Sequence, residues 1–506
     1  MKKIKLFTRI ASLALVVLMV LGIVSCGKKV DGIDTGASKD TVSTDQPPVE
    51  GGDKFEVPEV DYDGMDFYIL VSDNPDHTVD FAAQMEKIEA NTSTLDRAVF
   101  NRNERIEKQF NIDIECLIAA ANTEINTNIT TAVGSGSDVY HLVALHGQQT
   151  FNHIMSQRAV DWNTLEYVNL DNSWWNQSAR SIWATPGGKV FAMNGDISHM
   201  SVGNINAIYW NKTMFEAVPG LTTPTEHVKA GTWTFENFKK TIMELDASVT
   251  GTGSGSLADD SFAYASQRYR GPSLIIPSTG AYYIKLNNDG KYVVDIDNDR
   301  VITAVEQYLD LINSDVAVYD AGSISRSGGI RQGFKAGRIA LTVDNVKCAT
   351  SFAGAGLNYG IVPTYKYDDN AEDVWSEIGS GTNTFMVLIN TLNETRVKIS
   401  VILEAFAYYG QRDIISVYYD TILKYQTMPT AEDLEMLEAI HDSAAVSMAG
   451  YGNFGKISEI VWRTQEGEYS SIATAIASVK GPALLELDLF YSLDDWWDSL
   501  DHSMAD

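Results

Sequence analysis

Strand-like and helix-like patterns of hydrophobic residues follow one another over the first part of the chain that is predicted to fold. A continuous apolar run at 67–71 predicts a strand covered on both faces. Apolar residues at helical spacing follow over 95–110, and a second strand pattern occupies 112–116. A helix over 125–133 stops at a Gly-Ser-Gly breaker, and a third strand is expected over 138–145. This order predicts a parallel α/β sheet.

The same kind of pattern returns later in the chain. Four apolar residues over 235–245 share one helical face behind Thr234, a candidate N-cap, and another such face runs over 302–312. Both faces are expected to pack in a core. The Gly- and Ser-rich segment 249–257 lacks the Lys-Ser/Thr pair of a phosphate loop, so it is interpreted as a spacer.

The N-terminus has a pattern of its own. Four basic residues precede an apolar run at 10–23, which is shorter than the roughly 20 residues of a spanning helix. Val-Ser-Cys closes the run and resembles the bacterial lipobox. We therefore expect residues 1–25 to be a signal peptide and Cys26 to be the lipidated N-terminus; the alternative is an uncleaved anchor.

The polar segment that follows predicts where the protein works. Residues 26–58 comprise the lipidated cysteine and a flexible tether that is too polar to fold alone. The expected location is the outer face of the cell membrane, extracellular or periplasmic, with the membrane contacted through the lipid anchor.

Charge narrows the range of partners. Asp and Glu total 67 against 38 Lys and Arg, giving a net charge of −29. Nucleic acid and anionic lipid require clustered positive charge, so neither is expected as the main ligand. Cys116 and Cys348 show no metal-binding spacing, and two buried free thiols are expected rather than a disulfide.

No specific enzyme motif is present in the sequence. It contains no GxSxG, HExxH, GxxxxGK[ST] or strand-linked GxGxxG motif, although the separated carboxylates of a glycosidase would leave no motif. Asp295, Asp297, Asp299 and Glu306 have the spacing of a calcium loop, but Arg300 replaces its glycine. The preferred interpretation is an Asp-rich helix start, and no metal or cofactor is predicted.

Several segments together resemble family 1 of the bacterial extracellular solute-binding proteins, the maltodextrin-binding-protein-like group. The clearest is the Tyr-Trp-Asn-Lys strand and Phe-Glu helix at 207–220, followed by Gly-Thr-Trp-Thr-Phe at 231–235. The resemblance spans about 66–477, and Ser135-Gly-Ser-Asp-Val-Tyr departs from it by lacking a proline. The other matching segments, in the family's order, lie at 135–140, 187–193, 334–345, 359–364 and 379–383.

The resemblance implies an α/β, two-lobed periplasmic-binding-protein-like fold with a hinge of several chain crossings and a ligand cleft. By analogy, lobe 1 comprises 60–168 and 360–430, and lobe 2 comprises 169–359 and 431–506. The implied function is capture of a solute by lobe closure and its delivery to the transmembrane subunits of an ABC permease. The protein is expected to be a monomer and not an enzyme. A surface glycoside hydrolase or lyase and a receptor that loads a sensor kinase remain alternatives.

Ten Trp and 23 Tyr favour a carbohydrate ligand, most simply an oligosaccharide, because flat aromatic faces stack on sugar rings. One of Trp174 and Trp175 is expected to be the stacking platform, Trp233 is expected to be structural, and Trp210 could point either way. Ligands of α/β sheets lie beyond the carboxyl ends of strands. This rule selects Asp73, Asn74, His146 and Gln148, and with the family's layout it adds Asp196, Asp344, Asn345, Thr382 and Asn383.

Overall fold

A computed structural model describes the chain from residue 53 onward, over 53–74, 80–81, 93–246, 260–320, 328–372 and 374–500. The predicted signal peptide, Cys26, most of the tether and the spacer 249–257 lie outside these residues. Within them, no helix has both the length and the apolar character needed to cross a bilayer.

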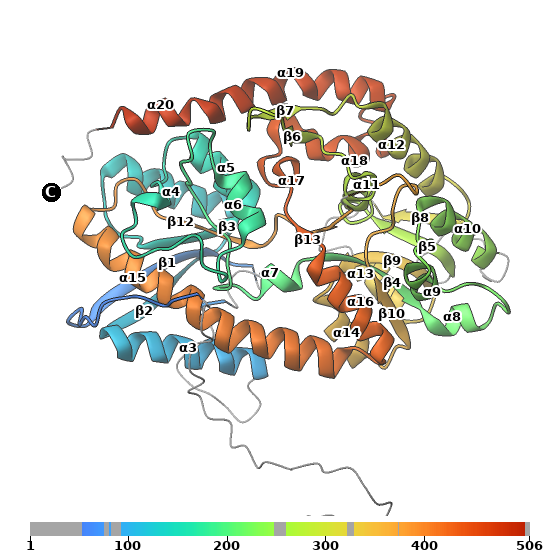
Figure 1. Cartoon of the computed structure of the whole chain (residues 1–506), viewed down its shortest axis with the longest axis horizontal. Coiled ribbons are helices and arrows are strands. Elements are labelled where there is room, and N and C mark those ends of the chain that lie inside the picture. The colour runs from blue at the N-terminus through green and yellow to red at the C-terminus, as the bar shows by residue number, and fades with distance from the viewer. Residues whose placement is uncertain are drawn as a thin grey trace, which may run out of the picture. The chain divides into compact units, whose positions relative to one another are not determined.

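The first sheet contains the strands that the hydrophobic pattern predicts. Its order is β12-β3-β1-β2, with β1 parallel to β2 and β3, and β12 antiparallel to β3. Helices α3 and α15 lie on one side of it and α4 and α5 on the other (Figure 1). The strands are β1 (Met65–Ser72), β2 (Ile112–Ala119), β3 (Leu142–His146) and β12 (Asn383–Met386), and the helices are α3 (Thr94–Phe110), α4 (Asn122–Ser135), α5 (Gly147–Met155) and α15 (Asn393–Tyr409).

Local sequence sets the ends of these elements. The Ser93 hydroxyl caps α3 by accepting a hydrogen bond from the backbone N–H of Asp96 at 3.0 Å. Gly136 ends α4 in the left-handed conformation, with φ of 67°, which glycine adopts at little cost. The two predicted helices and first two strands are confirmed, whereas β3 begins later than expected, at Leu142.

A second sheet holds the later strands in the order β10-β4-β9-β5-β8. Its β4 pairs antiparallel with β10 and β9, and its β5 pairs parallel with β9 and β8. The strands are β4 (Asn206–Asn211), β5 (Phe262–Gln267), β8 (Ala317–Asp320), β9 (Ile339–Asn345) and β10 (Tyr359–Val362), and the associated helices include α10 (Phe235–Asp246), α12 (Asp299–Ile312), α13 (Gly328–Lys335) and α14 (Cys348–Gly354).

The two later helices also follow their sequence patterns. Thr234 caps α10 as predicted, since its hydroxyl accepts a hydrogen bond from the Asn237 N–H at 3.3 Å. In α12 the buried face includes Val305 and Ile312, but Ile302 and Leu309 are only half-buried. The core-facing side of α12 is therefore rotated away from part of the predicted stripe, because neighbouring Val301 and Tyr308 fill the core instead.

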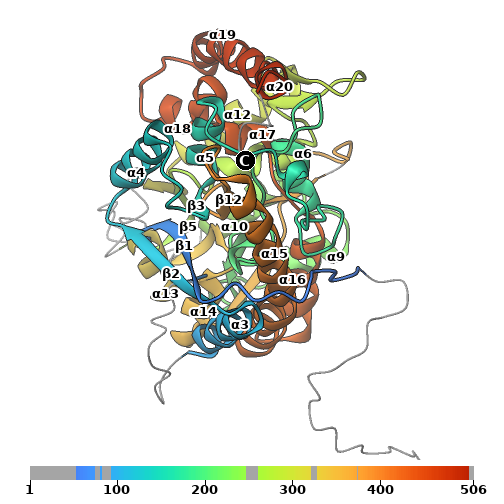
Figure 2. The ribbon, with the colours of Figure 1, turned by 90° about the vertical axis from the view of Figure 1, so that its left-hand side faces the viewer.

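The remaining elements surround the two sheets or link them. Figure 2 shows these helices and short strands from the side of the first sheet. They are η1 (Trp162–Thr164), α6 (Gln177–Trp183), α7 (Met200–Gly203), α8 (Lys212–Glu216), α9 (Pro224–Lys229), η2 (Pro272–Leu274), α11 (Ile275–Thr279), β6 (Ile284–Leu286), β7 (Tyr292–Val294), β11 (Ser376–Glu377), η3 (Gly410–Thr427), α16 (Ala431–Asp442), β13 (Ala444–Ala445), α17 (Met448–Gly452), η4 (Phe454–Glu459), α18 (Ile460–Gln465), α19 (Ile472–Tyr491) and α20 (Leu493–Asp498).

Three segments carry the chain between the sheets: 196–205, 363–382 and the π-helical η3, which continues α15. The first two are joined by Asn204, whose Nδ2 donates to the Gly379 carbonyl at 2.8 Å and to Thr382 Oγ1 at 3.1 Å. The third passes so close to the first that a Cβ built on Gly410 would lie 2.1 Å from the Asp196 carbonyl oxygen. Glycine is required at 410 for space.

Sheet membership places the changes of lobe later in the chain than the predicted boundaries at 168 and 360. The stretch that follows 168 still packs on the first sheet, because Met193 pairs with Phe385 of β12 and Trp183 stacks on Phe151 of α5. Likewise, β10 belongs to the second sheet through its pairing with β4. The chain leaves the first sheet near Asp196 and returns to it after Val362.

The two cysteines of the described part of the chain are free thiols as predicted, but only one of them has the predicted burial. Cys348 is buried and Cys116 is half-buried, and burial raises the pKa of the Cys116 thiol to about 12. A thiol with so high a pKa is a poor nucleophile near neutral pH.

Candidate functional site

Polar residues collect where the strand ends of the two sheets meet. His146 ends β3 opposite Asn383, the first residue of β12, and Asn345 ends β9 opposite Asn206, the first residue of β4. Other polar side chains join them from the crossings, from α5, β5 and α13, and from the N-cap of α17. We call this set the polar belt; it comprises His146, Gln148, Asn204, Asn206, Gln267, Arg270, Arg331, Asp344, Asn345, Glu377, Thr382, Asn383 and Ser447.

Amide groups connect the second sheet to the first crossing. Asn345 Nδ2 donates to the Asn204 carbonyl at 3.2 Å and to Asn206 Oδ1 at 3.1 Å. Arg270 Nη1 donates to the same Asn206 oxygen at 3.2 Å. Buried amides with such defined partners have fixed orientations, so this part of the belt is rigid.

Asp344 is the charged centre of the belt. Its buried carboxylate accepts two hydrogen bonds from Arg331, at 2.5 and 2.7 Å, and one from Gln267 Nε2 at 3.1 Å. Burial opposes ionisation, but the paired Arg331 guanidinium outweighs it and lowers the pKa of Asp344 below its usual value. Asp344 is therefore a carboxylate at neutral pH, and its charge is balanced locally.

Glu377 is a second carboxyl group in the belt, with a different protonation behaviour. Its Oε1 accepts a hydrogen bond from Ser447 Oγ at 2.8 Å. Burial raises the pKa of Glu377 to about 7, against the opposing effects of Ser447 and the nearby Arg270. The belt thus contains one acid that is ionised at neutral pH and one that titrates near neutrality.

The stability of the protein should depend on pH through Glu377. Because the folded-state pKa of Glu377 is raised, the folded state binds this proton more tightly than the unfolded state does. The contribution of Glu377 to stability is therefore fully present below about pH 4.5 and is lost as the pH rises through about 7. Glu377→Gln should flatten the decline between about pH 5 and pH 8, measured by urea unfolding. An unchanged pH profile would contradict the assignment.

The first-sheet side of the belt is formed at the start of α5. His146 caps this helix, with Nδ1 accepting from the Gln148 N–H at 3.2 Å. Gln148 Nε2 in turn donates to the Gly450 carbonyl of α17 at 3.1 Å. In the same region, Tyr451 donates to the Gly379 carbonyl at 3.3 Å. The C-terminal segment therefore contributes directly to this side of the site.

Behind the belt, buried groups fix the crossings. The Asp80 carboxylate contacts His199 Nδ1 at 2.9 Å and accepts from Asn383 Nδ2 at 2.7 Å. Arg102, buried on α3, donates to the Ile197 carbonyl at 2.8 Å and to the Asp80 carbonyl. These contacts give Asn383 a hinge-stabilising role in addition to its place in the belt.

The structure brings together six of the predicted site residues. His146, Gln148, Asp344, Asn345, Thr382 and Asn383 all belong to the polar belt. Their contact with a ligand stays a prediction.

The other three predicted polar residues are not part of the polar belt as defined above, although the parallel register of β1 and β3 places Asp73 at the same sheet edge as His146. Asp196 sits in the first crossing, where it accepts from Gln411 Nε2 at 3.0 Å and burial raises its pKa to about 7. Asp73 and Asn74 follow β1 as expected, and the Asp73 side chain is exposed.

The predicted stacking platform needs correction. Trp174 and Trp175 are only 2% and 1% exposed, and both indole N–H groups donate to the carboxylate of Glu404, at 3.1 and 3.0 Å. Neither ring presents an open face to a ligand, so both are structural residues of the first lobe. Trp233 is buried as expected and donates to the Pro363 carbonyl at 3.1 Å; Trp210 is also buried.

An exposed aromatic pair that sequence reasoning missed lies beside the second sheet. Tyr269, 41% exposed, is two residues past the end of β5, and its ring centroid is 5.9 Å from that of half-buried Trp462 in α18. The guanidinium of Arg268 lies 4.7 Å from the Trp462 ring. The strand-end rule would have selected Tyr269, but β5 was not recognised in the sequence.

The calcium-like spacing corresponds to a helix start. Asp295 pairs with Lys285 at 2.6 Å and Asp297 pairs with Lys480, while the Asn298 side chain caps α12 by accepting from the Arg300 N–H. The cap is therefore an asparagine amide rather than one of the aspartates. Among the described residues, no group of three or more His, Cys, Asp or Glu is placed to hold a metal ion.

Comparison with solved structures identifies the fold as a two-lobed, periplasmic-binding-protein-like α/β fold, as predicted. The acarbose-binding GacH receptor of Streptomyces glaucescens matches with a TM-score of 0.55 and 14% identity, covering 84% of this chain and 99% of that one. The maltotriose-bound MalE domain of Bdellovibrio bacteriovorus matches with a TM-score of 0.54 and 13% identity, covering 84% and 100%.

A ribitol-bound ABC transporter solute-binding protein from Agrobacterium radiobacter is similar as well, with a TM-score of 0.52 and 14% identity over 84% of this chain and 100% of that chain. Comparison of the sequence with protein-family models and with curated proteins finds no match. The assignment of this chain to the periplasmic-binding-protein-like fold therefore rests on structural similarity.

Proposed function

We propose that the protein is an extracytoplasmic substrate-binding lipoprotein that captures a carbohydrate between its lobes and delivers it to an ABC permease. The single observation that carries the proposal is the polar belt, in which amides and internally paired charges from both lobes meet at strand ends. Such groups hydrogen-bond hydroxyls without requiring a charged ligand. The lipobox at Cys26 supports the anchor.

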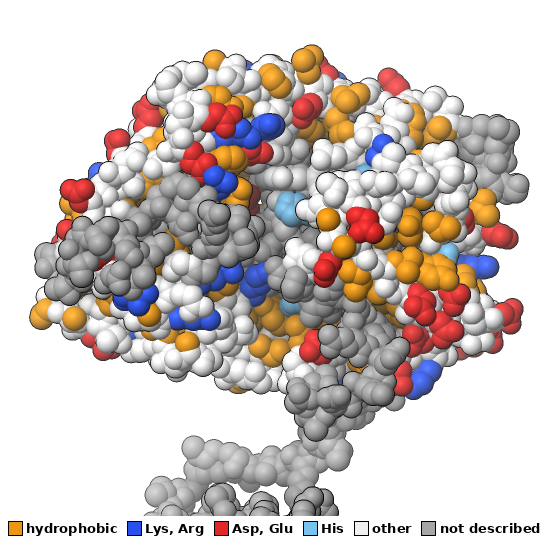
Figure 3. Space-filling model, turned by 180° about the vertical axis from the view of Figure 1, so that it is seen from behind, with side chains coloured by type: hydrophobic (Ala, Val, Ile, Leu, Met, Phe, Trp, Pro, Cys, Tyr) orange, Lys and Arg blue, Asp and Glu red, His pale blue; other side chains and the backbone are white. Residues whose placement is uncertain are grey.

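The charge distribution is consistent with a neutral ligand. The Asp344 charge is already paired with Arg331, and Glu377 titrates near neutrality beside Arg270. On the face shown in Figure 3, basic and acidic side chains are intermingled with hydrophobic ones. The structural neighbours described above include proteins bound to acarbose, maltotriose and ribitol, which favours polyhydroxylated ligands.

The proposal is tested by titrating the full-length protein in detergent with maltotriose, lacto-N-biose and ribitol in a calorimeter. Saturable binding, accompanied by a ligand-dependent rise in Tm, would support a carbohydrate binder. If none of a wider glycan panel binds, the carbohydrate proposal fails while the fold assignment stands. Release of reducing ends from a bound glycan would instead identify a glycoside hydrolase.

Trp462 is the aromatic residue that we expect to stack on the sugar. Trp462→Ala should weaken binding by about 1 kcal/mol, the lower end of the range for stacking on an aromatic side chain, because its ring already packs beside the guanidinium groups of Arg268 and Arg463. Calorimetry measures the change. Trp496→Ala is the matched control, since Trp496 is also half-buried but packs against Phe191 at 5.8 Å. Equal affinity in both variants would place the sugar elsewhere.

A further inference from the structure

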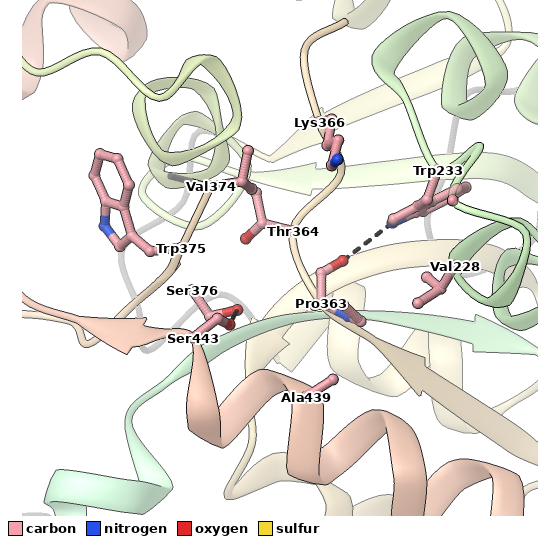
Figure 4. A pocket seen from close by; sticks show the side chains of 11 residues that line it. Val228, Trp233, Pro363, Thr364, Lys366, Val374, Trp375, Ser376, Ala439 and Ser443 are labelled. Carbon is pink, nitrogen blue, oxygen red and sulfur yellow. Dashed lines mark hydrogen bonds between the residues drawn. The ribbon is translucent and has the colours of Figure 1, made fainter. Parts of the chain in front are cut away.

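A cavity of about 200 Å³ lies in the region of the second sheet (Figure 4). Its walls come from four parts of the chain: the end of α9 and the loop after it, the segment after β10, the segment leading into β11, and the end of α16. They are formed by Val228, Gly231, Trp233, Pro363, Thr364, Lys366, Val374, Trp375, Ser376, Ala439 and Ser443.

The short ladder of β11 and β13 separates this cavity from the polar belt. Successive side chains of a strand point to opposite faces. Ser376 accordingly lines the cavity, while the next residue, Glu377, contacts Ser447 in the belt. The cavity is therefore distinct from the proposed sugar site, although both share this ladder.

The cavity contains a buried hydroxyl group without a hydrogen-bond partner among the described residues. Thr364 is only 5% exposed, and its Oγ1 has no hydrogen-bond partner in the described part of the chain. In Figure 4 this oxygen is directed towards the side of Ser376 and Ser443. Ser443 Oγ lies 3.1 Å from Ser376 Oγ and 3.2 Å from the Ile440 carbonyl oxygen, so the Ser376 hydroxyl already has a hydrogen-bond partner.

Positive charge is available at the same place. Lys366 is exposed, and no ion pair is found for its ammonium group among the described residues. None of the lining side chains is a carboxylate. The flexible four-carbon stem of Lys366 lets its ammonium group approach a ligand in the cavity. Within the described part of the chain, the cavity therefore combines one buried hydroxyl without a partner and one cation without an acidic partner, in a protein whose net charge is −29.

We propose that this cavity binds a small carboxylate with a short apolar body. An ionised carboxylate only accepts hydrogen bonds, so its two oxygens match the Thr364 hydroxyl and the Lys366 ammonium group, which also supplies the opposite charge. Val228, Pro363 and other apolar lining residues would cover the hydrocarbon part. A neutral sugar is a poorer match because its own hydroxyls bring as many donors as acceptors.

The proposal is tested with isobutyrate and its neutral isostere isobutyramide, titrated by calorimetry into the full-length protein. We expect saturable binding of isobutyrate that is about tenfold weaker in Thr364→Val and in Lys366→Met, the loss typical of removing a hydrogen bond to a charged group. Lys366→Arg should retain binding. The matched control is Thr303→Val, on the exposed face of α12.

Several outcomes would overturn it. Absence of saturable binding would mean that the cavity holds only water, and equal affinity for isobutyramide would mean that the carboxylate charge is not recognised. Isobutyrate binding that is unchanged in Thr364→Val would place the ligand outside the cavity. Thr364→Val is close to isosteric, and an unchanged urea midpoint would show that it still folds.

Discussion

Replacing Glu404 by Leu is expected to lower the free energy of unfolding by about 3 kcal/mol. Glu404 is 1% exposed and accepts hydrogen bonds from the side chains of Trp174, Trp175 and Asn172. Leucine would leave these three buried donors without acceptors, at a cost of about 1 to 3 kcal/mol each, partly offset because a buried carboxyl group is removed. Urea unfolding followed by circular dichroism measures the change.

The control for this prediction is Glu404→Gln. Its amide keeps one acceptor oxygen in the same place, so its destabilisation should be smaller than that of the leucine variant. If the free energy of unfolding of Glu404→Leu lies within about 1 kcal/mol of that of the unmodified protein, the two tryptophans do not depend on this carboxylate. Their packing alone would then hold the region together.

Asp344→Leu should lower the free energy of unfolding by about 2 kcal/mol and also abolish ligand binding. Removing one partner of a buried ion pair costs about 3 to 5 kcal/mol, but the Arg331 side chain is 26% exposed and solvent will compensate part of its charge. The loss of binding follows because Asp344 holds both Arg331 and Gln267 in place at the polar belt. Unfolding and calorimetric titration measure the two effects.

The double variant Asp344→Leu with Arg331→Met separates charge from packing. It removes both charges, so it should be more stable than Asp344→Leu alone while still failing to bind. If the single and double variants are equally stable, the pair contributes little electrostatic energy. If the single variant binds normally, the polar belt is not the ligand site.

The sequence predicted the first lobe well because its signals are local. The run at 67–71 is apolar throughout since both faces of β1 are covered, and the glycine that ends α4 is required by a left-handed backbone. The second sheet was harder to predict. Its β5 is followed by a turn rather than by a regular helix, and its order mixes parallel and antiparallel neighbours that no periodicity specifies.

The candidate site was predicted where it depends on strand ends and missed where it depends on side-chain packing. His146 and Asp344 follow from the rule that ligands lie beyond the carboxyl ends of strands. The sequence could not show that Glu404, more than 200 residues away, provides acceptors for both indoles of Trp174 and Trp175. It also could not show that Trp462 lies beside Tyr269, because that proximity arises from the packing of distant segments.

The close contact at Gly410 limits how the lobes can move. The long helix formed by α15 and η3 crosses the first connecting segment with no room for a side chain, and Asn204 joins that segment to the second within the same region. Three connecting segments that contact one another behave mechanically as a single pivot rather than as three independent linkers. Small torsional changes there would move distant surfaces through a large arc, so the amplitude of motion is set by the length of each lobe.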